Sequence, residues 1–198
     1  ALPISFDLSY LRCIPNMVIG APSDENQCRH MLQSAWLHKG PAAIRYPRGE
    51  GRGVPIDSSL SPLDIGKGEV LREGRDIAIL NFGVLLDQAL IAAETLNASV
   101  IDMRWVKPLD EALILSVAER HHCLITLEEN AIAGGAGSGV AEFIAQSGAT
   151  CTVRHIGIPD TFIAHAGQGE CRQLAGLTAE AIVAAAQTSA PMVSQQTL

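Results

Sequence analysis

Two arginines in the stretch "AAIRYPRGEGRG", residues 42–53, are of a type that could bind an anion. Arg48 stands just beyond the carboxyl end of a strand predicted at 42–46, and ligands of parallel α/β sheets gather beyond the carboxyl ends of strands. A guanidinium there can hold a phosphate through two parallel charge-assisted hydrogen bonds. The alternative is a solvent-exposed arginine in a turn that closes a domain, and the spacing alone leaves both open. Arg45 lies inside the strand, so we expect a structural ion-pair partner there; Arg45 and Tyr46 are also possible neighbours in the site.

The stretch "IAGGAGSGV", residues 132–140, is a second candidate for anion binding, because a glycine-rich loop exposes backbone amides at the start of a helix. It lacks the Gly-x-Gly-x-x-Gly spacing, since Val140 stands where a third glycine would follow Gly135 and Gly137, and it has no Walker lysine. The small residues also allow a helix start to pack tightly on a sheet or on another subunit. Whether residues 134–139 bind a ligand stays open at this point.

Two carboxylates, Glu128 and Glu129, precede that loop at the carboxyl end of a predicted strand. They could act as acid–base groups, and they could equally cap a helix or contact another subunit. The five cysteines and six histidines contain no Cys-x-x-Cys and no His-x-x-x-His spacing. We therefore expect no metal site within this chain.

The composition restricts the classes of partner. The 198 residues are 47% hydrophobic and carry a formal net charge of −7 without a block rich in lysine and arginine. Nucleic acids and anionic membranes require concentrated positive charge, so neither is an expected partner. No apolar stretch approaches the ~18–20 residues that span a bilayer, and the first residues lack the pattern of a signal peptide. We expect a cytoplasmic protein.

The elements that position these residues begin with one strand–helix–strand unit. A short apolar run at 17–19 is followed by a helix capped by Asp24, and then by the strand at 42–46. A right-handed crossover makes the two strands parallel. The apolar spacing in the helix predicts a buried stripe. Its members are Cys28, Met31, Leu32, Ala35 and Trp36.

A second alternation of strands and helices follows residues 50–66, a stretch of prolines and glycines without a sustained period that we interpret as a linker. The sequence around Gly74 predicts a hairpin or a short strand before a buried strand. In the helix that Pro108 and Asp110 open, the side chains of Leu113, Ile114 and Val117 are predicted to face inward. The alternation indicates an α/β fold with a mostly parallel sheet and helices on both faces. The expected strands are 77–81, 99–102, 123–130 and 151–158, and the expected helices are 85–96, one opened by Pro108 and Asp110, 137–148 and 178–187.

Taken together, the stretches "FDLSYLRCIPNMVIGAPSDENQCRHML", "GPAAIRYPRG", "DMRWVKPLDEALI" and "LEENAIAGGAGSGV" resemble the 1-deoxy-D-xylulose-5-phosphate synthases, a transketolase-like family. The stretches fall in the order found in that family, and the resemblance runs from Phe6 to about residue 186. It implies that residues 1–49 are the carboxyl-terminal part of a parallel α/β pyrimidine-binding domain. Residues 50–66 are then a linker, and residues 67–198 a transketolase-like carboxyl-terminal domain.

The resemblance also implies a reaction. The family uses thiamine diphosphate and Mg²⁺ to condense pyruvate with glyceraldehyde 3-phosphate, with release of carbon dioxide, as the first step of the methylerythritol phosphate route to isoprenoids. The arginine of the family's "YPRG" turn binds the phosphate of the acceptor, and it corresponds to Arg48. By resemblance, then, Arg48 is the anion-binding arginine and Arg45 its structural neighbour.

The resemblance does not include several motifs of the family's active site. The glycine-aspartate-glycine metal motif, the cofactor-activating glutamate and the Asp-x-x-x-His pair belong to sequence upstream of "FDLSYLR". We therefore expect no catalytic, cofactor-binding or metal-binding residue in this chain, inactivity in isolation, and a homodimer that contains the amino-terminal portion of the enzyme. Two alternatives are a noncatalytic module for dimer assembly and the beta subunit of a related 2-oxo acid dehydrogenase.

Overall fold

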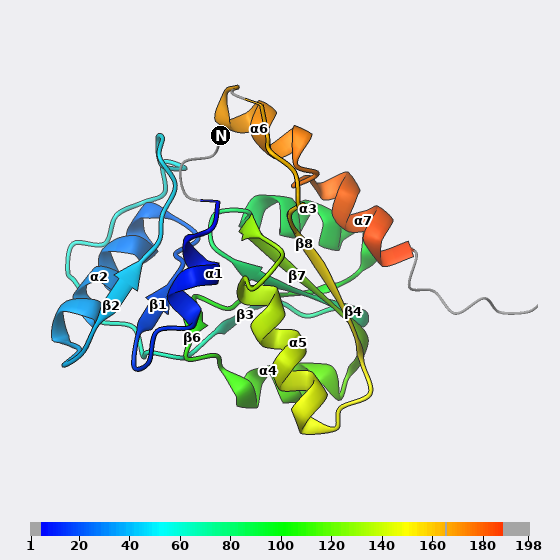
Figure 1. The fold of residues 1–198 in the computed structure, drawn as a ribbon, viewed down its shortest axis with the longest axis horizontal. Coiled ribbons are helices and arrows are strands. Elements are labelled where there is room, and N and C mark those ends of the chain that lie inside the picture. Colours follow the sequence, from blue (N-terminus) through cyan, green and yellow to red (C-terminus); the bar gives the residue numbers. More distant parts are fainter. Residues whose placement is uncertain (1–4, 165, 188–198) are drawn as a thin grey trace, which may run out of the picture.

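The chain forms two sheets with helices packed around them (Figure 1). The computed structural model describes residues 5–164 and 166–187. The strands are β1 (Val18–Gly20), β2 (Ala42–Ile44), β3 (Glu69–Arg72), β4 (Asp76–Phe82), β5 (Ser99–Asp102), β6 (Trp105–Lys107), β7 (His121–Ala131) and β8 (Thr152–Ile158). The helices are α1 (Asp7–Arg12), α2 (Glu25–Leu37), α3 (Leu86–Leu96), α4 (Glu111–Ala118), α5 (Ala136–Ser147), α6 (Gln168–Leu174) and α7 (Ala179–Gln187).

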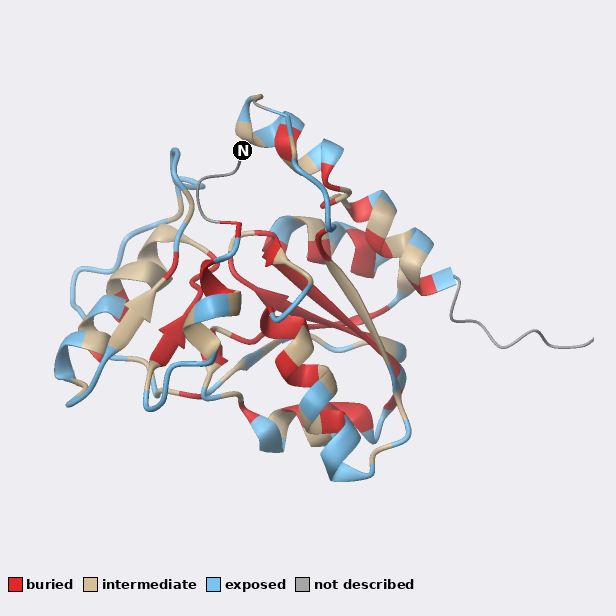
Figure 2. Cartoon of the chain, viewed as in Figure 1, coloured by how far each residue is buried: buried red, intermediate tan, exposed pale blue. Residues whose placement is uncertain are grey.

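The larger sheet has the order β3-β5-β4-β7-β8, and its pairs are parallel except for the antiparallel edge strand β3. The central strands β4 and β7 are buried along most of their length, as Figure 2 shows. Helices α3 and α7 cover one face, and α4 and α5 cover the other (Figure 1). A parallel sheet needs such cover on both faces. The predicted α/β fold with a mostly parallel sheet is confirmed.

The smaller sheet has the order β2-β1-β6. Strands β1 and β2 are parallel and joined through α2, as predicted, whereas the unpredicted β6 pairs antiparallel with β1. Strand β2 ends at Ile44, two residues earlier than predicted. The amide of Arg45 still donates to the carbonyl of Gly20 (2.8 Å), but Pro47 has no N–H with which pairing could continue.

The buried face of α2 differs from the predicted stripe. Asp24 caps the helix as expected, accepting a hydrogen bond from the amide of Gln27 (2.7 Å). However, Trp36 is 83% exposed and Leu32 is 49% exposed, so the predicted burial of these two side chains is wrong. The buried residues are His30, Met31 and Ser34. The helix therefore meets a hydrogen-bonding partner through His30 and Ser34, and it contributes Met31 to a small apolar cluster with Val18 and Trp105.

That partner is the segment 52–63, which we call the strap. Residues 50–66, all of them described, form neither helix nor strand, and the strap runs along α2. Polar side chains of the helix hold it at intervals, which explains why polar positions are buried on this face. Glu25 binds the backbone amides of Arg52, Gly53 and Val54. Asn26 and His30 both bind Asp57. Further along, His30 binds Ser61, and Ser34 binds Leu63. The division into two domains and a linker stays a prediction.

Helix α1, which was not predicted, ties the amino-terminal part to the larger sheet. The amide of Leu8 donates to Oδ1 of Asn130 (3.1 Å), and the hydroxyl of Ser9 donates to the carbonyl of Ala133 (2.8 Å). Side chains of α1 and of β1 also share a core cluster with α4 and α5. Contacts that join residues more than a hundred positions apart therefore fix the two parts together.

The remaining predicted elements are confirmed as β4, α3, β5, α4, β7, α5, β8 and α7. The hairpin alternative near Gly74 is wrong, because β3 pairs with β5 and not with β4. Gly74 is needed for a close approach of two backbones, since a Cβ there would lie 2.2 Å from the carbonyl carbon of Ala98. None of the helices in the described ranges has the length and apolarity of a membrane span.

Candidate functional site

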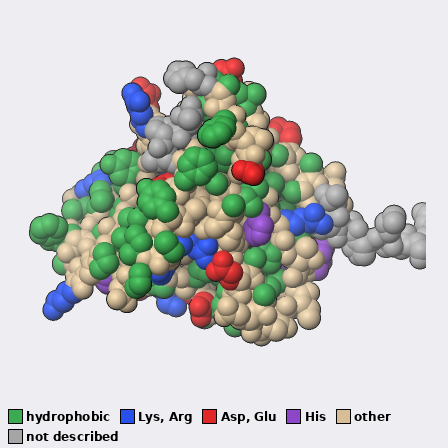
Figure 3. All heavy atoms as spheres, in the orientation of Figure 1, with side chains coloured by type: hydrophobic (Ala, Val, Ile, Leu, Met, Phe, Trp, Pro, Cys, Tyr) green, Lys and Arg blue, Asp and Glu red, His purple; other side chains and the backbone are tan. Residues whose placement is uncertain are grey.

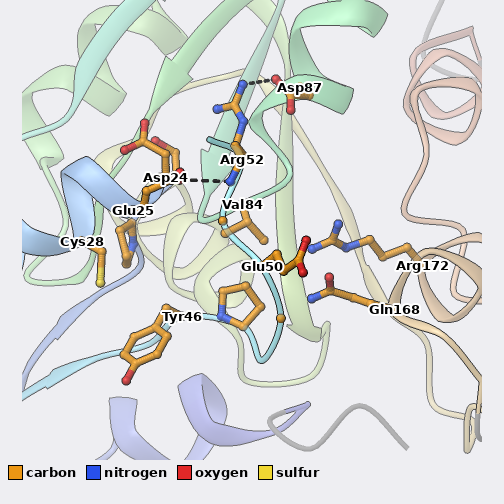
Figure 4. Close-up of a pocket in the computed structure, with 15 residues that line it drawn as sticks. Asp24, Glu25, Cys28, Tyr46, Glu50, Arg52, Val84, Asp87, Gln168 and Arg172 are labelled. Carbon is orange, nitrogen blue, oxygen red and sulfur yellow. Dashed lines mark hydrogen bonds and ion pairs between the residues drawn. The ribbon is translucent and has the colours of Figure 1, made fainter. Parts of the chain in front are cut away.

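A cavity of about 360 Å³ opens where four segments of the chain meet (Figure 4). The segments are the turn between β1 and α2, the turn after β2, the start of α3, and α6. The lining residues are Pro22, Ser23, Asp24, Glu25, Cys28, Tyr46, Pro47, Gly49, Glu50, Gly51, Arg52, Val84, Asp87, Gln168 and Arg172. The predicted anion-binding turn thus forms one wall of the cavity.

The topology explains why the cavity lies here. The turns after β1, β2 and β4 all follow the carboxyl ends of strands that have parallel partners, and such ends are where α/β folds place ligands. Gly83, with φ 104°, lets the turn after β4 reach the turn after β1. A Cβ at Gly83 would lie 3.8 Å from both the Cβ of Ala21 and the carbonyl oxygen of Pro22.

The structure separates the three residues that the sequence singled out on this turn. Tyr46 lines the cavity and is 58% exposed. Arg48 is exposed and stands between Pro47 and Gly49, which both line the cavity, but it is not itself a lining residue. Its backbone carbonyl accepts a hydrogen bond from Nε2 of Gln168 (3.3 Å), so α6 contacts the turn.

Three arginines surround the cavity, and two of them are engaged. Arg52 forms an ion pair with Asp87, and Nε of Arg172 lies 2.5 Å from Oε1 of Glu129. Among the residues that the structure describes, no hydrogen bond or ion pair engages the guanidinium of Arg48. Of the three, Arg48 is therefore the side chain whose charge is available to an anion.

Arg45 is buried and bound to the protein itself, as expected of a structural ion-pair partner. Its guanidinium donates to the carbonyl oxygen of Glu129 (2.6 Å) and lies 3.3 Å from the carboxylate of the same residue. Its Nε lies 3.6 Å from Oδ2 of Asp7. Burial raises the pKa of Asp7, and Arg45 opposes that shift. Arg45, directly after β2, thus joins this part of the chain to α1 and β7.

The two alternatives for the glycine-rich loop are now distinguished by contacts. The amides of Ala136 and Gly137, at the start of α5, each donate to the carboxylate of Glu128 (2.8 Å). Glu128 therefore caps the helix and occupies the position that an external anion would take. Burial raises its pKa to about 7, although both amides, Arg12 and Arg45 act in the opposite direction.

The glycines of this loop permit close packing. A Cβ at Gly137 would lie 2.4 Å from Oγ1 of Thr126 and 2.5 Å from Nδ1 of His155. A Cβ at Gly135 would lie 2.4 Å from the carboxylate of Glu128. Of the alternatives left open by the sequence, the structure shows helix capping and tight helix–sheet packing.

Sequence reasoning missed the contributions of α6 and of Glu25. Helix α6 has seven residues and begins after Gly167 without a side-chain cap, so it offered neither a period nor a capping signal. Its Gln168 and Arg172 point toward Glu50 in the cavity (Figure 4). No signal in the sequence indicated the contacts of Glu25, because its partners begin 27 positions further along the chain. Within residues 5–164 and 166–187, no group of three or more His, Cys, Asp or Glu side chains could hold a metal ion.

Comparison with known families identifies the two parts of the chain. Residues 66–182 match the model of the transketolase C-terminal domain, and residues 5–53 match the model of the transketolase pyrimidine binding domain. The chain belongs to the transketolase family. The cavity lies where residues of both transketolase domains meet, since Glu25 and Tyr46 come from one match and Asp87 and Arg172 from the other.

Curated relatives in this family are considerably longer than the chain. A 1-deoxy-D-xylulose-5-phosphate synthase of Vibrio vulnificus (strain CMCP6) is 57% identical over 178 residues, which are 90% of this chain and 29% of the relative. The synthase of Pseudomonas syringae pv. syringae (strain B728a) is 55% identical over 181 residues, 91% of this chain and 29% of the relative. The chain thus spans less than a third of the relatives' length.

Solved structures of transketolases share the fold. A structure described as a split gene transketolase, inactive beta4 tetramer, has a TM-score of 0.84 and 34% identity, and the match covers 94% of this chain and 62% of that one. The transketolase of Campylobacter jejuni has a TM-score of 0.64 at 18% identity, over 94% of this chain and 28% of that one. The second likeness concerns the fold alone.

Proposed function

We propose that the chain is part of a 1-deoxy-D-xylulose-5-phosphate synthase, which condenses pyruvate with glyceraldehyde 3-phosphate and uses thiamine diphosphate. The observation that carries this proposal is identity of 55–57% over 90% of the chain to relatives of that name. Membership of the transketolase family supports thiamine diphosphate as the cofactor. The cytoplasmic location expected from the composition stays a prediction.

In this proposal Arg48 binds the phosphate of glyceraldehyde 3-phosphate. Three features support the role: its side chain is exposed, no described residue pairs with its guanidinium, and its turn forms a wall of the cavity. Arg52 and Arg172 are neutralised by Asp87 and Glu129, so they are less available to an anion. A guanidinium offers two parallel donors that match two phosphate oxygens.

The described residues do not themselves fit the Mg²⁺ that accompanies the cofactor. They contain no group of three or more His, Cys, Asp or Glu side chains placed to hold a metal ion, whereas magnesium bound to a diphosphate requires oxygen ligands at closely defined positions. We therefore assign Mg²⁺ and most of the cofactor contacts to an amino-terminal portion of the enzyme, and we route no step of the reaction through the cofactor here.

We also propose that this portion and a second copy of the enzyme cover part of the surface seen in Figure 3. Hydrophobic side chains gather there over α1. Phe6, Tyr10 and Ile14 recur at a spacing of four residues and are 57%, 60% and 37% exposed. A contiguous exposed apolar surface of this kind marks interaction sites in soluble proteins.

A second function, that of a noncatalytic assembly module, is favoured by one observation. The similar split gene transketolase chain is described as an inactive tetramer of beta subunits. By analogy, this chain in isolation would associate with itself and catalyse nothing, and it would become part of an active enzyme only with its amino-terminal portion. The dehydrogenase beta subunit has no comparable support, since the relatives above are named as synthases.

The test replaces Arg48 in the assembled enzyme, that is, this chain together with the amino-terminal portion. Arg48→Ala should raise KM for glyceraldehyde 3-phosphate and leave the decarboxylation of pyruvate largely intact. A charge-assisted hydrogen bond contributes about 1.5–3 kcal/mol, so kcat/KM for the phosphorylated acceptor should fall about ten- to a hundredfold. Arg48→Lys should recover part of the loss, because it keeps the charge without the paired donors.

Unphosphorylated glyceraldehyde is the control, because it offers no phosphate to bind. Either substitution should affect its use much less than that of the phosphorylated acceptor. Equal losses for the two acceptors, or a defect confined to pyruvate, would show that Arg48 supports the fold or the cofactor site instead.

A further inference from the structure

Glu25, the first residue of α2, holds the segment that follows Arg48. Its carboxylate accepts hydrogen bonds from three consecutive backbone amides, those of Arg52 (3.0 Å), Gly53 (2.6 Å) and Val54 (3.0 Å). Three successive N–H groups that converge on one carboxylate form a concave anion-binding turn. In this chain the turn is filled by a side chain of the protein itself.

The glycines of the segment make this contact possible. A Cβ at Gly51 would lie 2.7 Å from Cδ of Glu25, so the backbone approaches the carboxylate as closely as a residue without a side chain allows. Gly53 has φ 77° and Gly49 has φ 146°, conformations that other residues rarely adopt. The stretch between these two glycines is thus shaped around Glu25.

The position of Glu25 in the first turn of a helix does not by itself explain its contacts with three backbone amides. Glu111 holds the same position in α4, directly after the capping residue Asp110, and it is exposed. Among the described residues, no hydrogen bond or ion pair joins its side chain to a loop. The pKa of Glu25 is lowered by its own backbone amide and by those of Gly53, Arg52 and Val54, which agrees with the geometry.

The position of the contact relates it to the cavity. Glu25, Gly49, Gly51 and Arg52 all line the cavity, and Arg48 lies on the same short turn. Two side-chain contacts also hold this part of the chain: that of Gln168 with the carbonyl of Arg48, and the ion pair of Arg52 with Asp87. Glu25 differs from both because it binds the backbone of three successive residues, so without it these amides lose their partner.

We propose that Glu25 is a positioning residue for acceptor binding: by fixing residues 52–54 it holds the turn 47–51 so that Arg48 faces the phosphate of the acceptor. This inference rests on the proposed function, because it assigns to Glu25 the placement of the phosphate-binding side chain. Glu25 acts through Arg48 and contacts neither substrate.

The test compares Glu25→Ala with Glu111→Ala in the assembled enzyme. Both variants remove a carboxylate from the first turn of a helix, so both lose the interaction with the helix dipole, but Glu25→Ala alone releases the turn. Since small misplacements of a binding group have large effects, KM for glyceraldehyde 3-phosphate should rise roughly five- to fiftyfold in Glu25→Ala. Decarboxylation of pyruvate and KM for unphosphorylated glyceraldehyde should stay near their original values, and Glu111→Ala should match the unmodified enzyme.

A second measurement does not depend on catalysis. Trypsin cleaves after arginine. Arg48 lies in the turn 47–51 and Arg52 directly follows it, so the rate of cleavage at these two sites reports how firmly the turn is held. Glu25→Ala should be cleaved there at least several-fold faster than Glu111→Ala. Glu25→Gln, which keeps the length and one acceptor oxygen, should fall between Glu25→Ala and the unmodified enzyme in both measurements.

Measuring Arg48→Ala in parallel distinguishes a failure of the role proposed for Arg48 from a failure of the role proposed for Glu25. If Arg48→Ala binds the acceptor normally, the proposed function of Arg48 is contradicted, and this inference with it. If Arg48→Ala is impaired while Glu25→Ala keeps its acceptor KM, or if the two alanine variants at Glu25 and Glu111 are cleaved alike, the positioning role of Glu25 is overturned and the role of Arg48 remains.

Discussion

At the scale of single residues, two arginines three positions apart have opposite environments. Arg45 follows directly on β2 and is 7% exposed against Asp7 and Glu129, whereas Arg48 lies beyond Pro47 and is exposed. The sequence predicted the structural role of Arg45 from its place in a strand. It could not identify Asp7 or Glu129 as the partners, because these lie 38 and 84 positions away and are brought near only by the packing of α1 and β7.

Removing Arg45 should destabilise the chain strongly. Arg45→Ala leaves the buried Asp7 without its counter-ion and Glu129 with Arg172 as its remaining one. Breaking a buried ion pair costs about 3–5 kcal/mol of unfolding free energy. Glu142→Ala is the control, because Glu142 is 61% exposed in its pair with Arg12, and an exposed pair contributes less than about 1 kcal/mol. Urea denaturation checks both variants, and comparable losses in the two would contradict the buried network.

Glu128 should make the stability depend on pH. Its pKa is raised from 4.5 to about 7, so between these values the folded state binds more protons at this position than the unfolded state. The contribution of Glu128 is therefore fully favourable below pH 4.5 and is lost as the pH rises through about 7, a change of a few kcal/mol. Glu128→Gln does not titrate, so its unfolding free energy should decline less from pH 5 to pH 8. Equal declines, measured by urea denaturation, would argue against this assignment.

At the scale of elements, the apolar period predicted helices well where an apolar core faces them. Helix α4 follows this rule: Ile114 is fully buried and Val117 nearly so, while Leu113 is only partly buried. Helix α2 does not, since its buried His30 and Ser34 face the hydrogen-bonding strap. A stripe of apolar residues indicates where a helix can be buried, but the element that covers it is decided by distant segments of the chain.

Replacing Leu113 or Ile114 of α4 by alanine should lower the stability by different amounts. Ile114→Ala removes a fully buried side chain from the core and should cost about 2–5 kcal/mol, whereas Leu113→Ala should cost less because its site is partly open to solvent. Thermal unfolding of the two variants checks the ranking. A larger loss for Leu113→Ala would mean that α4 is rotated relative to the sheet.

The short elements were missed for a different reason. Helices α1 and α6 have six and seven residues, and β6 has three, so none spans enough residues to establish a period. Each is stabilised by contacts with remote segments, such as those of β6 with β1 and of α1 with Asn130. As a result, the sequence predicted the larger sheet and one wall of the cavity, but not the wall formed by α6.

At the scale of the whole molecule, the cavity is assembled from both transketolase domains. Its lining residues include two arginines engaged in ion pairs and a tyrosine, and Arg48 stands on the turn that forms one wall. The described part of the chain offers no group of three or more His, Cys, Asp or Glu side chains that could hold a metal ion. The proposed enzyme therefore divides its tasks. In this proposal Arg48 of this chain binds the acceptor, and an amino-terminal portion supplies the magnesium motif and the glutamate that activates the cofactor.

Calorimetric titration with thiamine diphosphate and Mg²⁺ tests this division most directly. The isolated chain should show no saturable, magnesium-dependent binding and no product from pyruvate and glyceraldehyde 3-phosphate. The chain mixed with the amino-terminal portion should show both. Saturable, magnesium-dependent binding of the cofactor by the isolated chain would contradict the account, because it would require ligands that its described residues do not bring together.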